Sequence, residues 1–182
     1  MVIIIQLIYL TNNFISDFIS LNLVKLSQMK VIEKVPAKAR GLNFVNLLGG
    51  KTILAMSIQS DFDLIALSNE GITKASLDAL IGHLGISKKS FSENILDASV
   101  KTLERKKNTD RLDKRTSSHI IEITKVVEHA FLVFENEDKV KSWLNYPNRA
   151  LNNTKPIDLF YIPTGLKMVD DILGRIEYGV YS

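Results

Sequence analysis

Apolar residues recur at helical spacing through most of the chain, and this recurrence restricts the fold more than any other feature of the sequence. Between residues 73 and 135 they stand three and four positions apart, as one buried face of an α-helix requires. The widest apolar face comprises Ile120, Ile121, Ile123, Val126, Val127, Ala130, Phe131 and Phe134. No convincing sheet follows from the sequence, although residues 53–58 could form a strand or a helical turn. The pattern predicts an all-α fold.

Residues that favour helix ends divide this pattern into separate helices. A hydroxyl just before a helix accepts a hydrogen bond from a free backbone N–H. The residues in such positions are Ser60, Thr73, Ser87 and Ser99. Gly71 suits a left-handed C-cap, and a long helix is expected to begin after the polar stretch 108–118. Pro156 and Pro163 predict two later helix starts.

The last predicted helix has one apolar side and is followed by a short polar tail. Its apolar positions are Leu166, Val169, Ile172, Leu173 and Ile176. After Ile176 too few residues remain for another packed helix, so a free end with Arg175, Glu177 and Tyr178 could enter a partner's pocket. Tyrosine and arginine are enriched at binding hot spots. A frayed terminus is the alternative, because chain ends are commonly poorly ordered.

Positive charge is concentrated between residues 99 and 115. This stretch carries Lys101, Arg105, Lys106, Lys107, Arg111, Lys114 and Arg115 against three acidic residues. Two short helices, joined by a turn at 96–98 with a basic second helix at 99–107, are the elements of a helix-turn-helix. The candidate DNA-binding residues are Ser99, Lys101, Thr102, Arg105, Lys106 and Lys107. A solvated basic helix in an ordinary bundle is the alternative.

The first 28 residues are strongly apolar, and three explanations stand side by side. They could form an amphipathic packing segment, they could precede a true start at Met29, or they could target a membrane. Basic residues before the apolar run and a cleavage site after it, which a signal peptide needs, are both missing. Thr11, Asn12, Asn13 and Asp17 interrupt the run, whereas a membrane span needs about 20 apolar residues.

Residue chemistry argues against an enzyme. The absence of cysteine fits a reducing cytoplasm and excludes disulfides and cysteine-bound zinc. His83, His119 and His129 are far apart and are assigned to different helices, so each is expected to be an ordinary packed or surface residue. Asp170 and Asp171 are adjacent and would point about 100° apart on a helix. We therefore expect no catalytic residue, no metal and no cofactor.

Several spaced motifs resemble one family of antitoxins. In the C-terminal region they are Trp143-Leu144, Pro147-Asn148, residues 154–159, Gly165 and residues 173–180. Residues 61–65, 71–75, 84–87 and 102–105 are similar to the helix-turn-helix region of the same family. The chain thus resembles Xre-type antitoxins of Xre–RES toxin–antitoxin systems, which are related to ParS and MbcA. The resemblance covers residues 42–182, with the C-terminal motif the more specific part.

The resemblance implies a function and a division of the chain. In this family the RES toxin consumes NAD⁺, and the antitoxin, usually a dimer, covers the toxin's active site and represses its own operon. The expected division is an N-terminal extension at 1–40, a helix-turn-helix region at 41–116 and a toxin-binding domain at 117–182. The expected toxin-binding residues are Trp143, Arg175, Glu177, Tyr178, Gly179, Val180 and Tyr181.

The expected partners are therefore a RES-type toxin, operator DNA and a second copy of the chain, in the cytoplasm and without a membrane. The alternative function is a stand-alone transcription regulator whose C-terminal unit only dimerises. Trp143, as the only tryptophan, could equally anchor the core of that unit.

Overall fold

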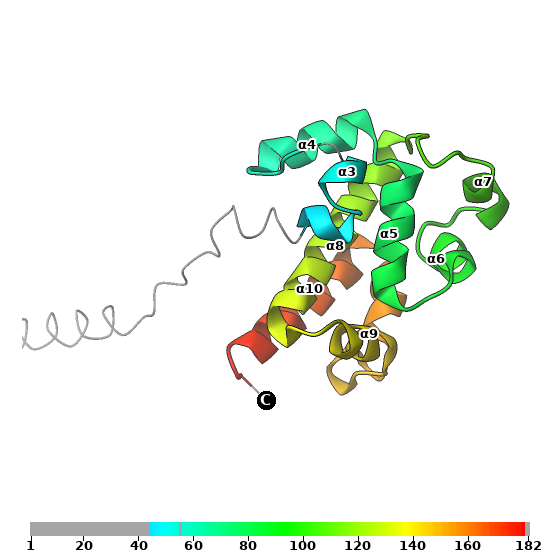
Figure 1. Cartoon of the computed structure of the whole chain (residues 1–182). Coiled ribbons are helices and arrows are strands. Elements are labelled where there is room, and N and C mark those ends of the chain that lie inside the picture. Colours follow the sequence, from blue (N-terminus) through cyan, green and yellow to red (C-terminus); the bar gives the residue numbers. More distant parts are fainter. Residues whose placement is uncertain (1–43, 55, 181–182) are drawn as a thin grey trace, which may run out of the picture. The chain divides into compact units, whose positions relative to one another are not determined.

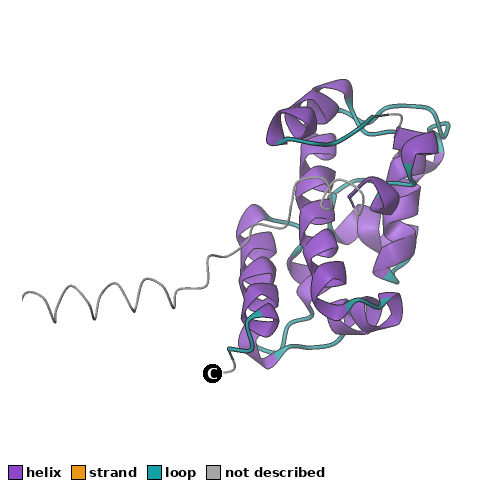
Figure 2. Ribbon diagram, turned by 60° about the vertical axis from the view of Figure 1, so that its left-hand side comes forward, coloured by secondary structure: helices purple, strands orange, loops and turns teal. Residues whose placement is uncertain are grey.

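A computed structural model of the chain describes residues 44–54 and 56–180, all within one compact unit spanning 37–182. Among these residues the regular elements are helical, and the ribbon of Figure 2 contains no strand. Only two isolated β-bridges occur there, Thr73 with Arg111 and Asn148 with Thr154. The predicted all-α fold is confirmed. The predictions for residues 1–28 and for Tyr181 lie outside the described residues.

The helices follow one another with short connections (Figure 1). After a helical turn at residues 44–47 they are α3 (Lys51–Leu54), α4 (Asp61–Glu70), α5 (Lys74–Leu84), α6 (Lys88–Asn94), α7 (Val100–Glu104), α8 (Lys114–Phe134), α9 (Glu137–Asn145), the 3₁₀ turns η1 (Arg149–Leu151) and η2 (Pro156–Leu159), and α10 (Pro163–Glu177). The open choice for residues 53–58 is decided in part, because Ile53 and Leu54 are helical.

The longest helix, α8, holds the fold together. Helices α4, α9 and α10 all pack on it, and Figure 1 shows α8 running through the middle of them. The predicted apolar face is confirmed: Ile120, Ile123, Val127 and Ala130 are completely buried. Buried Glu128, on the same helix, accepts a hydrogen bond of 3.2 Å from the backbone N–H of Phe44. The start of the described chain is thereby tied to its central helix.

The predicted start of this helix was wrong by several residues. Helix α8 begins at Lys114, inside the stretch expected to be a polar loop up to 118. Asp113 is the N-cap and accepts hydrogen bonds from the N–H and the hydroxyl of Thr116, and the N–H bond lowers the pKa of the Asp113 carboxyl. Lys114 and Arg115 therefore lie in the first turn of α8 and not in a loop.

Three of the expected caps are confirmed. Ser60, Thr73 and Ser87 each accept a hydrogen bond from a backbone N–H in the first turn of the following helix. Gly71 does not form the predicted left-handed cap, because its φ of 86° comes with an extended ψ of 135°. Leu112 explains the glycine, since its carbonyl oxygen would lie only 2.3 Å from a Cβ at that position.

The connection before the last helix is packed into the core and positions that helix. Residues 146–162 form two 3₁₀ turns whose side chains Leu151, Ile157 and Phe160 are buried. Gly165, in the first turn of α10, packs on the carbonyl of Leu159, which would lie 2.0 Å from an added Cβ. The predicted apolar side of α10 then meets α8, with Leu166, Val169, Ile172 and Leu173 buried.

Gly165→Ala should destabilise the protein, because its methyl group cannot fit against the Leu159 backbone. Overpacking of this kind costs about 1–3 kcal/mol, whereas Gly→Ala at an unobstructed helix position stabilises by about 0.5–1 kcal/mol. Urea unfolding of the two variants Gly165→Ala and Gly82→Ala measures both changes in the free energy of unfolding. At Gly82 nothing lies within 4 Å of the added Cβ. Equal effects of the two substitutions would contradict this account of the α10 start.

Candidate functional site

The end of α10 is ordered further than the sequence suggested. Arg175 and Glu177 belong to the helix, which ends at Glu177, and are not part of a free tail. Gly179, with a φ of 66°, turns the chain, and the N–H of Val180 donates to the carbonyl of Arg175 at 2.9 Å. This six-residue closure resembles a Schellman turn. The predicted free end therefore begins no earlier than Val180.

One histidine binds the last two turns of α10 to the central helix. The Nδ1 atom of His129, on α8, lies 2.6 Å from a carboxylate oxygen of Asp170, and its Nε2 atom lies 3.3 Å from one of Glu177. Asp170 and Glu177 are seven residues apart, so they share one side of α10. We call His129, Asp170 and Glu177 the α8–α10 clamp.

The clamp changes the acid–base behaviour of its histidine. The hydrogen bond that His129 donates to Asp170, together with the contact with Glu177, raises the pKa of His129 against the effect of partial burial. When His129 is protonated it can donate to both carboxylates at once. The prediction of an ordinary packed histidine missed this role. The signal that could have found it was the seven-residue spacing of the two acids on the last helix.

The surface at the end of α10 combines exposed aromatic and apolar groups with an unpaired cation. Tyr178 and Val180 are 58% and 59% exposed. Arg175 is exposed, and no carboxylate of the described residues pairs with it. Asp171 is occupied by Lys167 at 2.6 Å. The structure thus brings Arg175, Tyr178, Gly179 and Val180 together at one end of the last helix.

Trp143 has a packing role. It is partly buried, and its ring centroid lies 5.4 Å from that of Phe134 at the end of α8. The same helix, α9, buries Val140 and Leu144. This arrangement favours the second reading of Trp143, as an anchor of the core.

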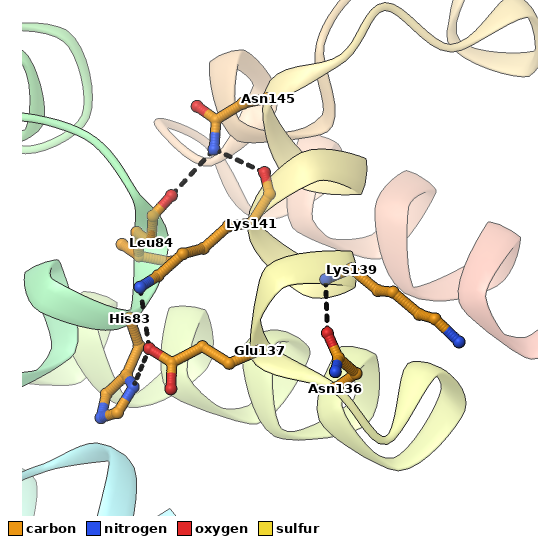
Figure 3. A network of polar contacts seen from close by, with 7 residues as sticks. All are labelled: His83, Leu84, Asn136, Glu137, Lys139, Lys141 and Asn145. Carbon is orange, nitrogen blue, oxygen red and sulfur yellow. Dashed lines mark hydrogen bonds and ion pairs between the residues drawn. The ribbon is translucent and has the colours of Figure 1, made fainter.

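Polar contacts also join α9 to α5, as Figure 3 shows. The carboxylate of Glu137 bridges the Nζ of Lys141 at 2.9 Å and the Nδ1 of His83 at 3.2 Å. The side-chain amide of Asn145 donates to the carbonyl of Leu84 at 2.8 Å. The hydrogen bond from Lys141 lowers the pKa of Glu137. These contacts, with α8, connect the first half of the described chain to the second.

The candidate DNA-binding residues lie on and just after a helix shorter than predicted. Helix α7 ends at Glu104 instead of Lys107, and the Ser99 side chain makes no capping bond. The N–H of Lys107 donates to the Asp110 carboxylate at 2.8 Å, which turns the chain away from a helical path. Ser99, Lys101, Thr102, Arg105 and Lys107 are exposed and Lys106 is partly buried, all within nine consecutive positions.

This stretch is available to an anion. Among the described residues no carboxylate pairs with Lys101, Arg105, Lys106, Lys107, Lys114 or Arg115. Arg111 is held instead, since its guanidinium donates to the carbonyl of Gly71 at 2.6 Å and lies 3.5 Å from Glu70. The predicted basic region is thus one helix, the loop after it and the first turn of α8.

The turn between α6 and α7 has the predicted length. Ile95 and Ser99 are the cap residues, so three residues separate them as predicted. Asp97 takes the left-handed conformation, with a φ of 49°, which glycine often supplies there and aspartate tolerates. Beneath α7 lies a cavity of about 30 Å³ lined by Leu77, Val100 and Leu103, among others. It is far smaller than a ligand pocket, which measures about 300–1,000 Å³.

The remaining candidates for chemistry are packed or isolated. His119 and His129 share α8, contrary to the assignment of each histidine to its own helix. Burial lowers the pKa of His119. Within residues 44–54 and 56–180, no group of three or more His, Cys, Asp or Glu side chains is arranged to hold a metal ion. In the same part of the chain no helix is both long and apolar enough to cross a membrane.

Comparison with known proteins identifies the region around the clamp. Residues 129–179 match the family described as the Antitoxin Xre/MbcA/ParS C-terminal toxin-binding domain. These residues are therefore similar to the toxin-binding domains of that family. The matched segment runs from His129, at the α8 side of the clamp, to Gly179, at the turn that closes α10.

Two similar proteins agree with the match. One is named Antitoxin Xre, from Yersinia enterocolitica serotype O:8, and is 30% identical over 84 residues, which are 45% of this chain and 57% of the relative. The other is also named Antitoxin Xre, from Photorhabdus laumondii subsp. laumondii, and is 31% identical over 67 residues, 36% of this chain and 45% of the relative. The chain therefore spans about half the length of these curated relatives. The resemblance to Xre-type antitoxins is confirmed.

The clamp should make the stability of the region around α10 depend on pH. Because the pKa of His129 is raised above its ordinary 6.5, its contribution is complete below about pH 6.5 and is lost as the pH rises through the raised pKa. We expect a loss of about 1 kcal/mol, since both carboxylates are partly exposed. His129→Gln should flatten this pH dependence in urea unfolding at pH 5.5–9. An unchanged profile would contradict a charged clamp.

Proposed function

We propose that this chain is the antitoxin of a type II toxin–antitoxin system. It binds a RES-type, NAD-consuming toxin, occludes the toxin's active site and represses its own operon through the helix-turn-helix. The observation that carries the proposal is the toxin-binding domain at residues 129–179. The two relatives named Antitoxin Xre support the same function. The chain acts by binding and performs no chemistry of its own.

Occlusion is supported by the way α10 presents its end. The α8–α10 clamp and the packing of Ile172 and Leu173 fix the direction of the helix. A rigid helix end loses little conformational entropy on binding. Tyr178 and Val180 are exposed on the turn that closes the helix, and this turn is small enough to enter a cleft while the helix rests on its rim. Arg175 would meet acidic or carbonyl groups of the toxin.

Repression is supported by the exposed cations around α7. Side chains near the start of the second helix of a helix-turn-helix reach base edges, and cations around it bind phosphates. In this chain the residues proposed to reach base edges are Lys101, Thr102 and Arg105. The residues proposed to bind phosphates are Lys106, Lys107, Lys114 and Arg115. Because such proteins read two half-sites with two-fold symmetry, we expect a homodimer on the operator. A cytoplasmic location follows from these partners.

Deletion of residues 179–182 should abolish neutralisation and leave the fold intact. The deletion removes Gly179 and Val180 of the closing turn, while the clamp and all of α10 through Glu177 remain. Co-expression with the protein encoded by the adjacent reading frame, scored by colony formation, provides the measurement. Full protection by the truncated chain, with an unchanged melting temperature, would contradict occlusion by the chain end. That outcome would favour the alternative function, a transcription regulator whose C-terminal unit only dimerises.

Lys101→Ala together with Arg105→Ala should weaken operator binding at least 10-fold at 0.15 M salt and reduce its salt dependence. Each lost phosphate contact lowers the slope of log K against log salt by about 0.9. The matched control is Lys139→Ala with Lys155→Ala, which removes the same charge from exposed positions of the C-terminal domain. Fluorescence anisotropy with upstream DNA measures both. Equal losses in the two double variants would show a general charge effect without a specific site.

A further inference from the structure

Ser92, on α6, carries a hydroxyl group that the described chain leaves without a hydrogen bond. The residue is 0% exposed, and its Oγ atom has no hydrogen-bond partner among the described residues. A buried hydroxyl that makes no hydrogen bond destabilises the folded state. Native proteins therefore pair nearly all such groups, either with their own atoms or with ordered water.

Other completely buried hydroxyls show what a partner within the chain looks like. Thr124 donates to the carbonyl of Ile120, four residues earlier in its helix, at 2.7 Å. Ser117 accepts a hydrogen bond of 2.9 Å from the backbone N–H of Ile72. Ser92 makes neither kind of contact with the described residues. Its surroundings therefore decide what could pair with it.

The Ser92 side chain lines the cavity of about 30 Å³ between α5, α6 and α7. The apolar part of the wall includes Leu77, Ile81 and Leu103. A cavity holds a water molecule once it offers about 10–15 Å³ and several polar partners. This cavity is therefore large enough for water, and it is too small for an organic ligand.

Charged side chains provide the further partners that a buried water needs. Lys74, Asp78, Lys88 and Glu104 line the same cavity. Asp78 contacts the Nζ atoms of Lys74 at 2.6 Å and Lys88 at 2.9 Å, and each of its carboxylate oxygens can accept a second hydrogen bond. The Lys74 side chain is only 12% exposed, so these charges extend inward from the surface. A buried water typically makes about three hydrogen bonds, and this wall can supply them.

We propose that the cavity binds a water molecule that links Ser92 of α6 to the charged groups of α5 and thereby positions α7. Helix α7 packs on α6 (Figure 1) and contains no fully buried residue. Its inner residues Val100 and Leu103 are partly buried and line the cavity, so the contents of the cavity set how closely α7 approaches α5. Ser92 is a positioning residue in this arrangement and does not touch DNA.

The melting temperature of Ser92→Ala tests whether the hydroxyl has a partner. With water bound, the substitution removes a hydrogen bond and should lower the melting temperature by about 2–6 °C relative to a control. With the hydroxyl unpaired, the substitution removes a buried polar group and should raise it. The control is Ser142→Ala, at an exposed position inside α9, which accounts for the helix preference of alanine. A melting temperature equal to or above that of the control would overturn the water site.

A crystal structure of the unaltered chain tests the site directly. We expect an ordered water within about 3.2 Å of the Oγ atom of Ser92, with Asp78 or a neighbouring charged group as its second partner. A Ser92 hydroxyl that donates to the carbonyl of Lys88 in its own helix, with no ordered water in the cavity, would overturn the site.

The effect of the water on operator binding rests on the proposed function, in which α7 carries the base-reading residues. Ser92→Ala should raise Kd for upstream DNA by about 5-fold or more, because α7 is displaced from the base edges. Kd for scrambled DNA of the same length should change less than about 2-fold, because no phosphate-binding cation is removed. Ser142→Ala should leave both values unchanged.

The two DNA sequences separate the possible failures. Equal weakening of both complexes by Ser92→Ala would indicate a general loss of structure and would overturn the positioning role. If the unaltered chain does not distinguish upstream from scrambled DNA, the proposed repression fails and the positioning role fails with it. The water site itself does not depend on DNA, because the melting temperatures and the crystal structure decide it.

Discussion

The burial of one apolar face along α8 is the interaction on which the rest of the structure depends. Helices α4, α9 and α10 each pack on this helix, and Ile120, Ile123, Val127 and Ala130 are shut away from water beneath them. Removing apolar side chains from water is the main driving force for folding. Because α8 extends from Lys114 to Phe134, its first turn carries cations, and its last turns lie in the segment that matches the toxin-binding domain family.

This shared helix joins two regions that the sequence presents as separate. The boundary drawn at residues 116 and 117 falls within the first turn of α8. Contacts from Glu137 to His83 and from Asn145 to Leu84 join the two sides again, between α9 and α5. A single packed body would thus bind a toxin at α10 and an operator at α7. Within that body the clamp at His129 fixes the last helix.

The glycines of this chain differ in whether the surrounding structure leaves room for a side chain. Gly71 and Gly165 leave room for carbonyl oxygens of Leu112 and Leu159, so their absence of a side chain is explained by internal packing. At Gly82 and Gly174, by contrast, an added Cβ would meet no atom within 4 Å. Sequence alone does not separate these cases, because the atom that would collide with a Cβ comes from elsewhere in the fold.

The local pattern of the sequence determined the helical class, most helix starts and the buried faces, because caps and apolar spacing act within a few residues. The spaced motifs of the sequence showed the resemblance to antitoxins, and the local pattern predicted the three-residue turn before α7. Contacts between distant residues decided the rest. Asp113 caps α8 at an earlier position than predicted, and Asp110 binds the N–H of Lys107 where the basic helix was expected to continue. Glu177 contacts His129 on another helix. Only the tertiary structure places such partners together, since 48 residues separate His129 from Glu177 along the chain.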